Sequence, residues 1–131
     1  MEVKYNDPTD LRPEGKRILD APLVRMNIPE FVEQIKNEQT WKTSDKNAMT
    51  IYKNDAMRIV LIGLHKGAVL QKHTAEGNIS VQVIEGEIKF NTDADSVTLE
   101  KGGMVALHKG LPHSVEAVKE SVFLLTLSIQ K

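Results

Sequence analysis

The side chains best able to do chemistry in this chain are its histidines, because the sequence contains no cysteine. Imidazole nitrogens bind metal ions, exchange hydrogen bonds and transfer protons near neutral pH. The four are His65, His73, His108 and His113. His73 opens the stretch "HTAEGNISVQVIEGE", and His113 closes the stretch "HKGLPH". A thiolate metal site and a disulfide framework are both excluded.

Alternation in the residues after His73 indicates which way that histidine points. In "ISVQV", apolar residues alternate with serine and glutamine from Ile79 onward, which is the pattern of a strand with one buried face. Counting back by twos from Ile79 reaches Ala75 and then His73. His73 is therefore predicted to face the interior, beside an apolar stripe that continues to Val81.

Short strands are the elements that must position these histidines. The runs are "AMTIYK", "MRIVLIGLH", "ISVQVI", "EIKF", "SVTL", "MVALH", "HSVEAV" and "SVFLLTLSI". Eight short strands separated by turn residues predict an all-β sandwich or barrel. A turn at Glu85-Gly86 is expected to reset the buried phase, since Ile88 and Phe90 are the apolar residues beyond it.

One helix is predicted before the strands, over Asn27–Trp41. Its first residue can cap the helix, and Pro29 suits the first turn. An apolar stripe along the helix must pack against another element, so Phe31 and Trp41 are expected to fill core. Residues 1–20 are polar, aperiodic and contain two prolines, which predicts an extended arm.

Composition excludes several classes of function. The chain has 131 residues, with 17 lysines and arginines against 18 acids, so no basic field attracts nucleic acid or an anionic membrane. No apolar run approaches the roughly 20 residues of a membrane span, and the first residues do not form a signal peptide. We therefore expect one domain, cytoplasmic, with neither a nucleic-acid partner nor a membrane partner.

Two motifs combine glycines with a histidine at set spacings. The first consists of Gly67, His73 and Gly86, and the second of Gly102, Gly110 and His113. Together with the strand pattern, they make residues 48–129 resemble a small single-domain cupin, an RmlC-like jelly roll. The resemblance implies a jelly-roll β-sandwich closed toward a barrel over residues 48–131. Residues 1–47, the arm and helix, would pack outside it as part of one structural domain.

The resemblance also implies a metal site, which this chain retains only in part. Family sites hold a divalent ion with three histidines and a glutamate. Ala75 stands where the second histidine belongs and Ile79 where the glutamate belongs, so His73 and His113 remain. Two imidazoles hold an ion weakly, because three protein ligands plus water is the usual minimum for a catalytic site.

A metal at this site needs a further donor. Glu76 follows Ala75 in a flexible stretch, His108 stands in place of the proline of the second motif, and His65 ends a strand. The ion would be Zn, Ni, Fe or Mn. No cofactor is certain on these residues, and each extra donor has a plain alternative as a solvated surface residue.

Two functions stay open, and no catalytic residue is assigned for either. The first is a small-molecule binding protein whose pocket is lined by His73, Ala75, Ile79, Val81 and His113. The second is a metal-dependent cupin enzyme of oxygenase or isomerase type, with His73, His113 and a substitute donor such as Glu76 or His108 as ligands. A purely structural or partner-binding role is the third class.

A homodimer is expected from the resemblance and from one strand. The outward residues of "SVQVI" are Ser80, Gln82 and Ile84, none of them charged. A fully solvated strand would usually carry lysine or glutamate there, so a neighbouring subunit or the N-terminal arm is expected to cover this face.

Overall fold

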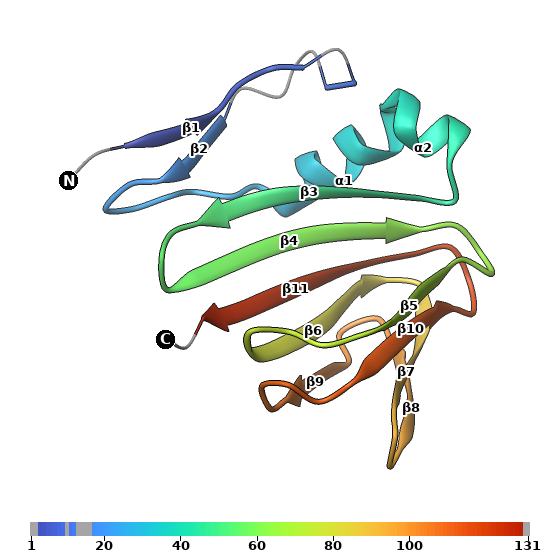
Figure 1. The fold of residues 1–131 in the computed structure, drawn as a ribbon. Coiled ribbons are helices and arrows are strands. Elements are labelled where there is room, and N and C mark those ends of the chain that lie inside the picture. Colours follow the sequence, from blue (N-terminus) through green and yellow to red (C-terminus); the bar gives the residue numbers. More distant parts are fainter. Residues whose placement is uncertain (1–2, 10, 13–16, 130–131) are drawn as a thin grey trace.

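The described part of the chain folds into two larger antiparallel β-sheets, two short helices and an N-terminal arm that contains a two-stranded sheet, β1-β2 (Figure 1). The computed structural model describes residues 3–9, 11–12 and 17–129. The parts of the predicted arm at residues 1–2, 10 and 13–16 lie outside these ranges. The strands are β1 (Lys4–Asn6), β2 (Arg17–Asp20), β3 (Lys46–Lys53), β4 (Met57–Leu64), β5 (Val69–His73), β6 (Gly77–Glu85), β7 (Glu87–Thr92), β8 (Ser96–Glu100), β9 (Met104–Leu107), β10 (His113–Ala117) and β11 (Ser121–Ile129). The helices are α1 (Ile28–Asn37) and α2 (Gln39–Thr43).

The two larger sheets form the predicted sandwich, but they do not close into a barrel. One has the order β3-β4-β11-β6-β9 and the other β5-β10-β7-β8. In the described part of the chain, no strand of one sheet pairs with a strand of the other, so the edges stay open. The core between the sheets is one cluster of buried residues, namely Ile62, Leu64, Ala68, Ile79, Val81, Val83, Ile88, Phe90, Leu99, Val115, Ala117 and Phe123.

Each of the eight predicted runs coincides with a strand to within one residue, but β5 was missed and the arm contains β1 and β2. The segment Val69–His73 carries only two apolar residues before its polar end, so the sequence offers little alternation there. Neither helix in the described residues is long and apolar enough to cross a membrane.

The predicted turn at Gly86 is confirmed, and it carries the chain from one sheet to the other. It joins β6 in the five-stranded sheet to β7 in the four-stranded sheet. Ile88 and Phe90 therefore face the same core as the β6 stripe, from the opposite layer. This crossing between sheets is the physical reason for the change of apolar phase.

Replacing Gly86 by alanine is expected to destabilise the fold more than the same change at Gly102. Both glycines have a left-handed φ, of +89° and +85°, which costs any residue with a Cβ about 1–2 kcal/mol. At Gly86 a Cβ would also lie 2.3 Å from the Glu120 carbonyl oxygen, whereas at Gly102 nothing lies within 4 Å. We expect an additional loss of about 1–2 kcal/mol for Gly86→Ala, measured by urea denaturation. Equal losses at the two positions would contradict this packing.

The predicted helix is present but broken in two. Asn27 caps α1, its Oδ1 accepting a hydrogen bond from the Glu30 backbone N–H at 3.2 Å. At Glu38 the backbone turns extended, with φ −78° and ψ 152°, and α2 follows. Trp41 is buried, as predicted, and Phe31 packs half-buried against a second cluster on the outer side of the large sheet.

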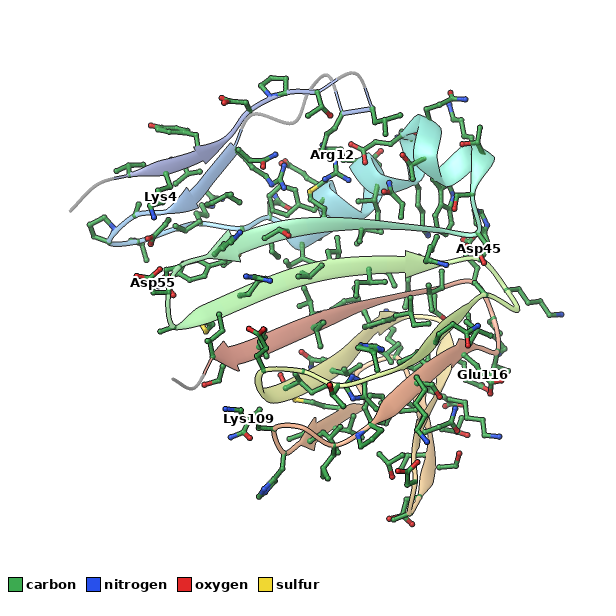
Figure 2. All side chains as sticks on the ribbon, in the orientation of Figure 1. Lys4, Arg12, Asp45, Asp55, Lys109 and Glu116 are labelled. Atoms are coloured by element: carbon green, nitrogen blue, oxygen red, sulfur yellow. The ribbon has the colours of Figure 1, made fainter. Side chains whose placement is uncertain are left out.

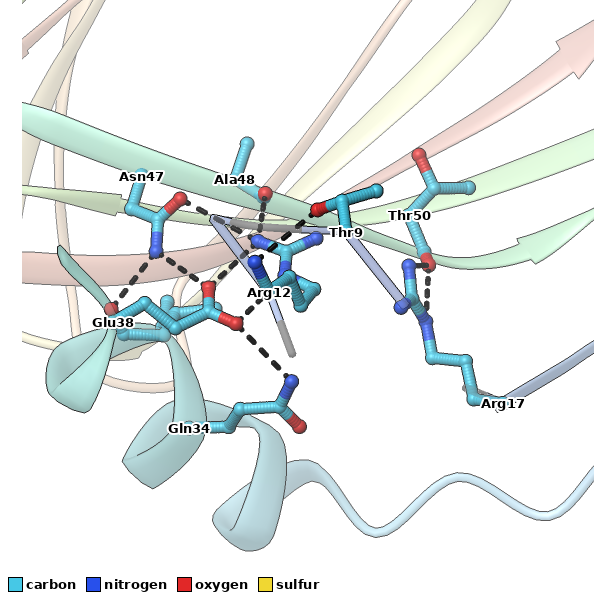
Figure 3. A network of polar contacts seen from close by, with 9 residues as sticks. Thr9, Arg12, Arg17, Gln34, Glu38, Asn47, Ala48 and Thr50 are labelled. Atoms are coloured by element: carbon cyan, nitrogen blue, oxygen red, sulfur yellow. Dashed lines mark hydrogen bonds and ion pairs between the residues drawn. The ribbon is translucent and has the colours of Figure 1, made fainter. Parts of the chain in front are cut away.

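The arm is fixed to the edge of β3 by a polar network (Figure 3). The Arg12 guanidinium donates to both carboxylate oxygens of Glu38, at 2.7 and 2.8 Å, and to the Ala48 carbonyl at 2.8 Å. Buried Asn47 donates to the Ile35 carbonyl and to Glu38, each at 2.9 Å. Arg17 donates to the Thr50 carbonyl at 2.9 Å. The edge of β3 is thereby partly covered by the arm.

The outer face of β6 is therefore not covered by the described part of the arm. The arm lies along β3, at the opposite side of the five-stranded sheet (Figure 1). Ile84 packs against the second cluster, while Met104 of β9, which pairs with Gln82, is 56% exposed. The homodimer stays a prediction, and light scattering of the purified protein is the measurement that checks it.

Candidate functional site

The structure brings His73 and His113 together at one end of the sandwich. They are register partners on β5 and β10, and their ring centroids lie 4.4 Å apart at an interplanar angle of 58°. We call this end, bounded by the β3–β4 turn at Asp55, the loop 74–76 and the loop 108–112, the histidine end. Figure 2 shows Asp55 and Lys109 at this end and Asp45 at the other.

A β-bulge in β5 sets the direction of His73. Val115 of β10 pairs with Leu70, while His113 pairs with His73, so β5 takes three steps where β10 takes two. Leu70 packs against the core, and strict alternation from it would place residue 73 on the other face. The extra residue restores His73 to the side of buried His113. Bulges commonly re-aim a side chain in this way beside functional sites.

The two imidazoles present the same nitrogen. His73 Nδ1 lies 2.7 Å from the Gln71 carbonyl oxygen, and His113 Nδ1 lies 3.0 Å from the Leu111 carbonyl oxygen. A carbonyl oxygen only accepts, so each Nδ1 carries the hydrogen. In the neutral rings Nε2 then keeps its lone pair. The pair thus offers two acceptor nitrogens, suited to hydroxyl or N–H donors of a ligand, or to a metal ion.

The two rings differ in their surroundings. His113 is 4% exposed and stacks on Phe90 at a centroid distance of 5.7 Å, whereas His73 is exposed. Burial lowers the pKa of His113 below its ordinary value of 6.5, and the charge that His73 can carry lowers it further, against the hydrogen bond to the Leu111 carbonyl. The lowered pKa favours the neutral His113 ring, whose Nε2 is a hydrogen-bond acceptor.

We expect His73→Gln to raise the pKa of His113, because it removes a neighbouring ring that can become positive. NMR titration of the His113 ring protons measures this. The depressed pKa also means that the unfolded state takes up the proton more readily than the folded state. Stability contributed by neutral His113 is complete above about pH 6.5 and decreases as the pH falls toward the folded pKa. An unchanged His113 pKa in the variant would contradict the coupling.

The other predicted pocket residues lie in or beside the core. Ile79 and Val81 are buried in the cluster between the sheets, and half-buried Ala75 packs against it. Glu76 and His108 are exposed. His65 is engaged elsewhere, stacked on Trp41 at 3.6 Å with its Nε2 2.8 Å from the Trp41 carbonyl. Its Nδ1 lies 3.8 Å from a carboxylate oxygen of Glu120.

A cavity that the sequence did not indicate adjoins His113. It has a volume of about 210 Å³ and is lined by Lys72, Asn91, Thr92, Asp93, Pro112, His113 and Ser114. Lys72 and Asp93 form an ion pair at 2.6 Å in its wall. Of the five predicted pocket residues, only His113 lines this cavity. The residues come from three strands and their loops, so no spacing in the sequence groups them.

No protein-family model matches the sequence, and no curated protein is significantly similar to it. Solved structures are similar in fold. An RmlC-like cupin protein from Desulfovibrio desulfuricans has a TM-score of 0.60 and 21% identity, over 82% of this chain and 90% of that one. A cupin-2 domain containing protein from Shewanella frigidimarina has a TM-score of 0.62 and 17% identity, over 79% and 93%. The chain has the cupin fold. A cupin superfamily protein from Desulfitobacterium hafniense agrees, with a TM-score of 0.63 and 15% identity over 65% and 78%.

The donor set does not fit the four-ligand metal site that the resemblance to cupins implies. His73 and His113 supply two nitrogens, but Ala75 and Ile79 carry no donor atom in their side chains. Among the described residues, no three histidine, aspartate or glutamate side chains gather closely enough to hold an ion. We therefore derive no reaction through a metal at this site.

Proposed function

We propose that this cupin-fold protein binds a small, partly apolar molecule at its histidine end. The observation that carries the proposal is the facing pair of His73 and His113, with each Nδ1 tied to a backbone carbonyl. Neither Nε2 atom has a hydrogen-bond partner among the described residues, and a neutral Nε2 accepts hydrogen bonds, so the ligand presents hydroxyl or N–H groups to them. A few convergent polar groups beside an apolar wall are typical of small-molecule sites.

Partial exposure of inward side chains supports an apolar wall at the same end. Leu107, Leu125 and Leu127 pack against the core cluster yet keep some accessible surface. Toward the other end of β11, Phe123 and its register partner Val83 of β6 are each 1% exposed. The inward leucines of β9 and β11 are therefore less completely covered at the histidine end, while Ile79 between Leu107 and Leu127 is itself buried. A ligand lying on these leucines would remove apolar surface from water.

The test is a thermal-shift screen with small phenols and alcohols, followed by titration of the hits. We expect at least one hit whose Kd rises about tenfold in His113→Ala, since one buried hydrogen bond and its shape are lost. His108→Ala is the matched control, because His108 is an exposed histidine with an equal loss of atoms. Equal effects of both substitutions, or hits unaffected by His113→Ala, would reject the site.

A further inference from the structure

Arg58 is a cation on the inward face of an otherwise apolar strand. The inward phase of β4 is set by Val60, Ile62 and Leu64, which contribute to the cluster between the sheets, while Ile59 and Leu61 pack in the outer cluster. The pairing of β4 with β11 is continuous from Leu64 to Met57, so no bulge shifts that phase. Alternation therefore directs Arg58 to the interior.

The register places Arg58 at the histidine end. On β11, Arg58 pairs with Leu127. Leu127 in turn pairs with Ile79 of β6, and Ile79 pairs with Leu107 of β9. These four residues and Lys53 of β3, which pairs with Arg58, form one row across the five-stranded sheet. Arg58 and Ile79 are two strands apart, about 10 Å at the usual spacing. The row thus has two cations toward one side, Lys53 and Arg58, and the predicted pocket residue Ile79 toward the other.

The guanidinium lacks an anionic partner in the described part of the chain. Its Nε is shielded from solvent and has no hydrogen-bond partner. Asp55 and Glu76 are the acids in the adjacent turns, and neither forms an ion pair with it. On β3 its register partner is another cation, Lys53. A half-buried donor that has no acceptor lowers the stability of the folded protein. Such a donor is therefore expected at a site where a ligand supplies the acceptor.

We propose that Arg58 binds the carboxylate of the ligand whose hydroxyl end meets His73 and His113. The inference rests on the proposed function and narrows it to small hydroxylated organic acids. A planar guanidinium matches a carboxylate, and its positive charge balances that of a monoanion. A neutral His113 does not attract the carboxylate as Arg58 does. The charge of Arg58 therefore fixes which end of the ligand binds at each side of the site.

The experiment compares two acids with their uncharged amides: hydroxybenzoate with hydroxybenzamide, and hydroxyphenylpropionate with its amide. We expect the parent protein to bind at least one acid about tenfold more tightly than its amide, by NMR titration at pH 7. In Arg58→Gln this preference falls to about one. Lys53→Gln, which removes a neighbouring exposed cation, keeps the preference and controls for the general field.

The outcomes separate this inference from the proposed function. Acid and amide binding equally to the parent, with both weakened by His113→Ala, would overturn the carboxylate subsite and leave the histidine site standing. Absence of binding by either acid at millimolar concentration would overturn the subsite as well. A melting temperature of Arg58→Met equal to or above that of the parent is expected, because the variant removes a shielded, unpaired donor. A large fall in melting temperature would show that Arg58 is structural and would overturn the proposal.

Discussion

Replacing Ala75 by histidine together with Ile79 by glutamate is expected to raise the affinity for divalent metal well above that of the parent. The double variant would add an imidazole and a carboxylate beside His73 and His113, which already face each other. The fold favours this addition, because half-buried Ala75 packs on the same cluster in which Ile79 is buried. A set of three histidines and one carboxylate supplies enough ligands for Zn or Ni.

The expected effect on stability has two opposite parts. Ile79 is 4% exposed, so a glutamate there loses solvation and costs on the order of several kcal/mol without metal. A bound ion pairs with that charge, and it stabilises the folded state by about 4 kcal/mol at a thousand times its Kd. Thermal melts with Zn, with Ni and with a chelator measure both parts. The parent should show little metal-dependent shift.

The matched control is Ala75→His with Ile79→Gln, which has a similar shape but no negative charge. We expect metal to raise the thermal stability of this control much less than that of the glutamate variant, because the ion then lacks its anionic ligand. Equal metal-dependent shifts in the parent and in Ala75→His with Ile79→Glu would show that these two positions do not point toward the histidine pair. Elemental analysis of the purified proteins gives an independent readout of bound metal.

Alternation and turn residues predicted much of the fold, and the failures have local causes. The stripe from Ile79 is a core strand because its apolar residues recur every second position. The open sandwich depends on which edges pair, which no local pattern records. Glu38, at which the helix breaks, is bound through its carboxylate to Arg12, a partner 26 residues earlier. A residue with good helix propensity gives no warning of this.

Less of the site than of the fold could be predicted from the sequence. Counting by twos from Ile79 leads to His73 through a loop, whereas in the structure the bulge between Leu70 and His73 sets its direction. The tautomers of His73 and His113 are set by contacts with backbone carbonyls, and residue types alone do not indicate such contacts. Arg58 could have been singled out, because it shares the phase of Val60 and the apolar residues after it, and a cation in that phase is unusual.

Glu38→Gln is expected to lower the free energy of unfolding by about 3 kcal/mol, because it leaves a half-buried guanidinium without its counter-charge. The Glu38 carboxylate accepts two hydrogen bonds from Arg12, one from Asn47 at 2.9 Å and one from Gln34 at 3.2 Å. Glutamine keeps the shape but turns an amide group toward these donors. Urea denaturation measures the loss. Asp45→Asn, in an exposed pair with Lys46, should change stability by less than about 0.5 kcal/mol.

The same carboxylate gives the prediction a pH signature. Burial alone would raise the pKa of Glu38, but hydrogen bonds from Arg12, Asn47 and Gln34 outweigh burial and hold the pKa below its ordinary value of 4.5. The unfolded state therefore binds this proton first as the pH falls. The stability that Glu38 contributes is complete above about pH 4.5 and is lost as the pH falls through the lower, folded pKa. The difference in unfolding free energy between parent and Glu38→Gln should shrink over that range. A difference independent of pH would mean that shape, rather than charge, anchors the arm to β3.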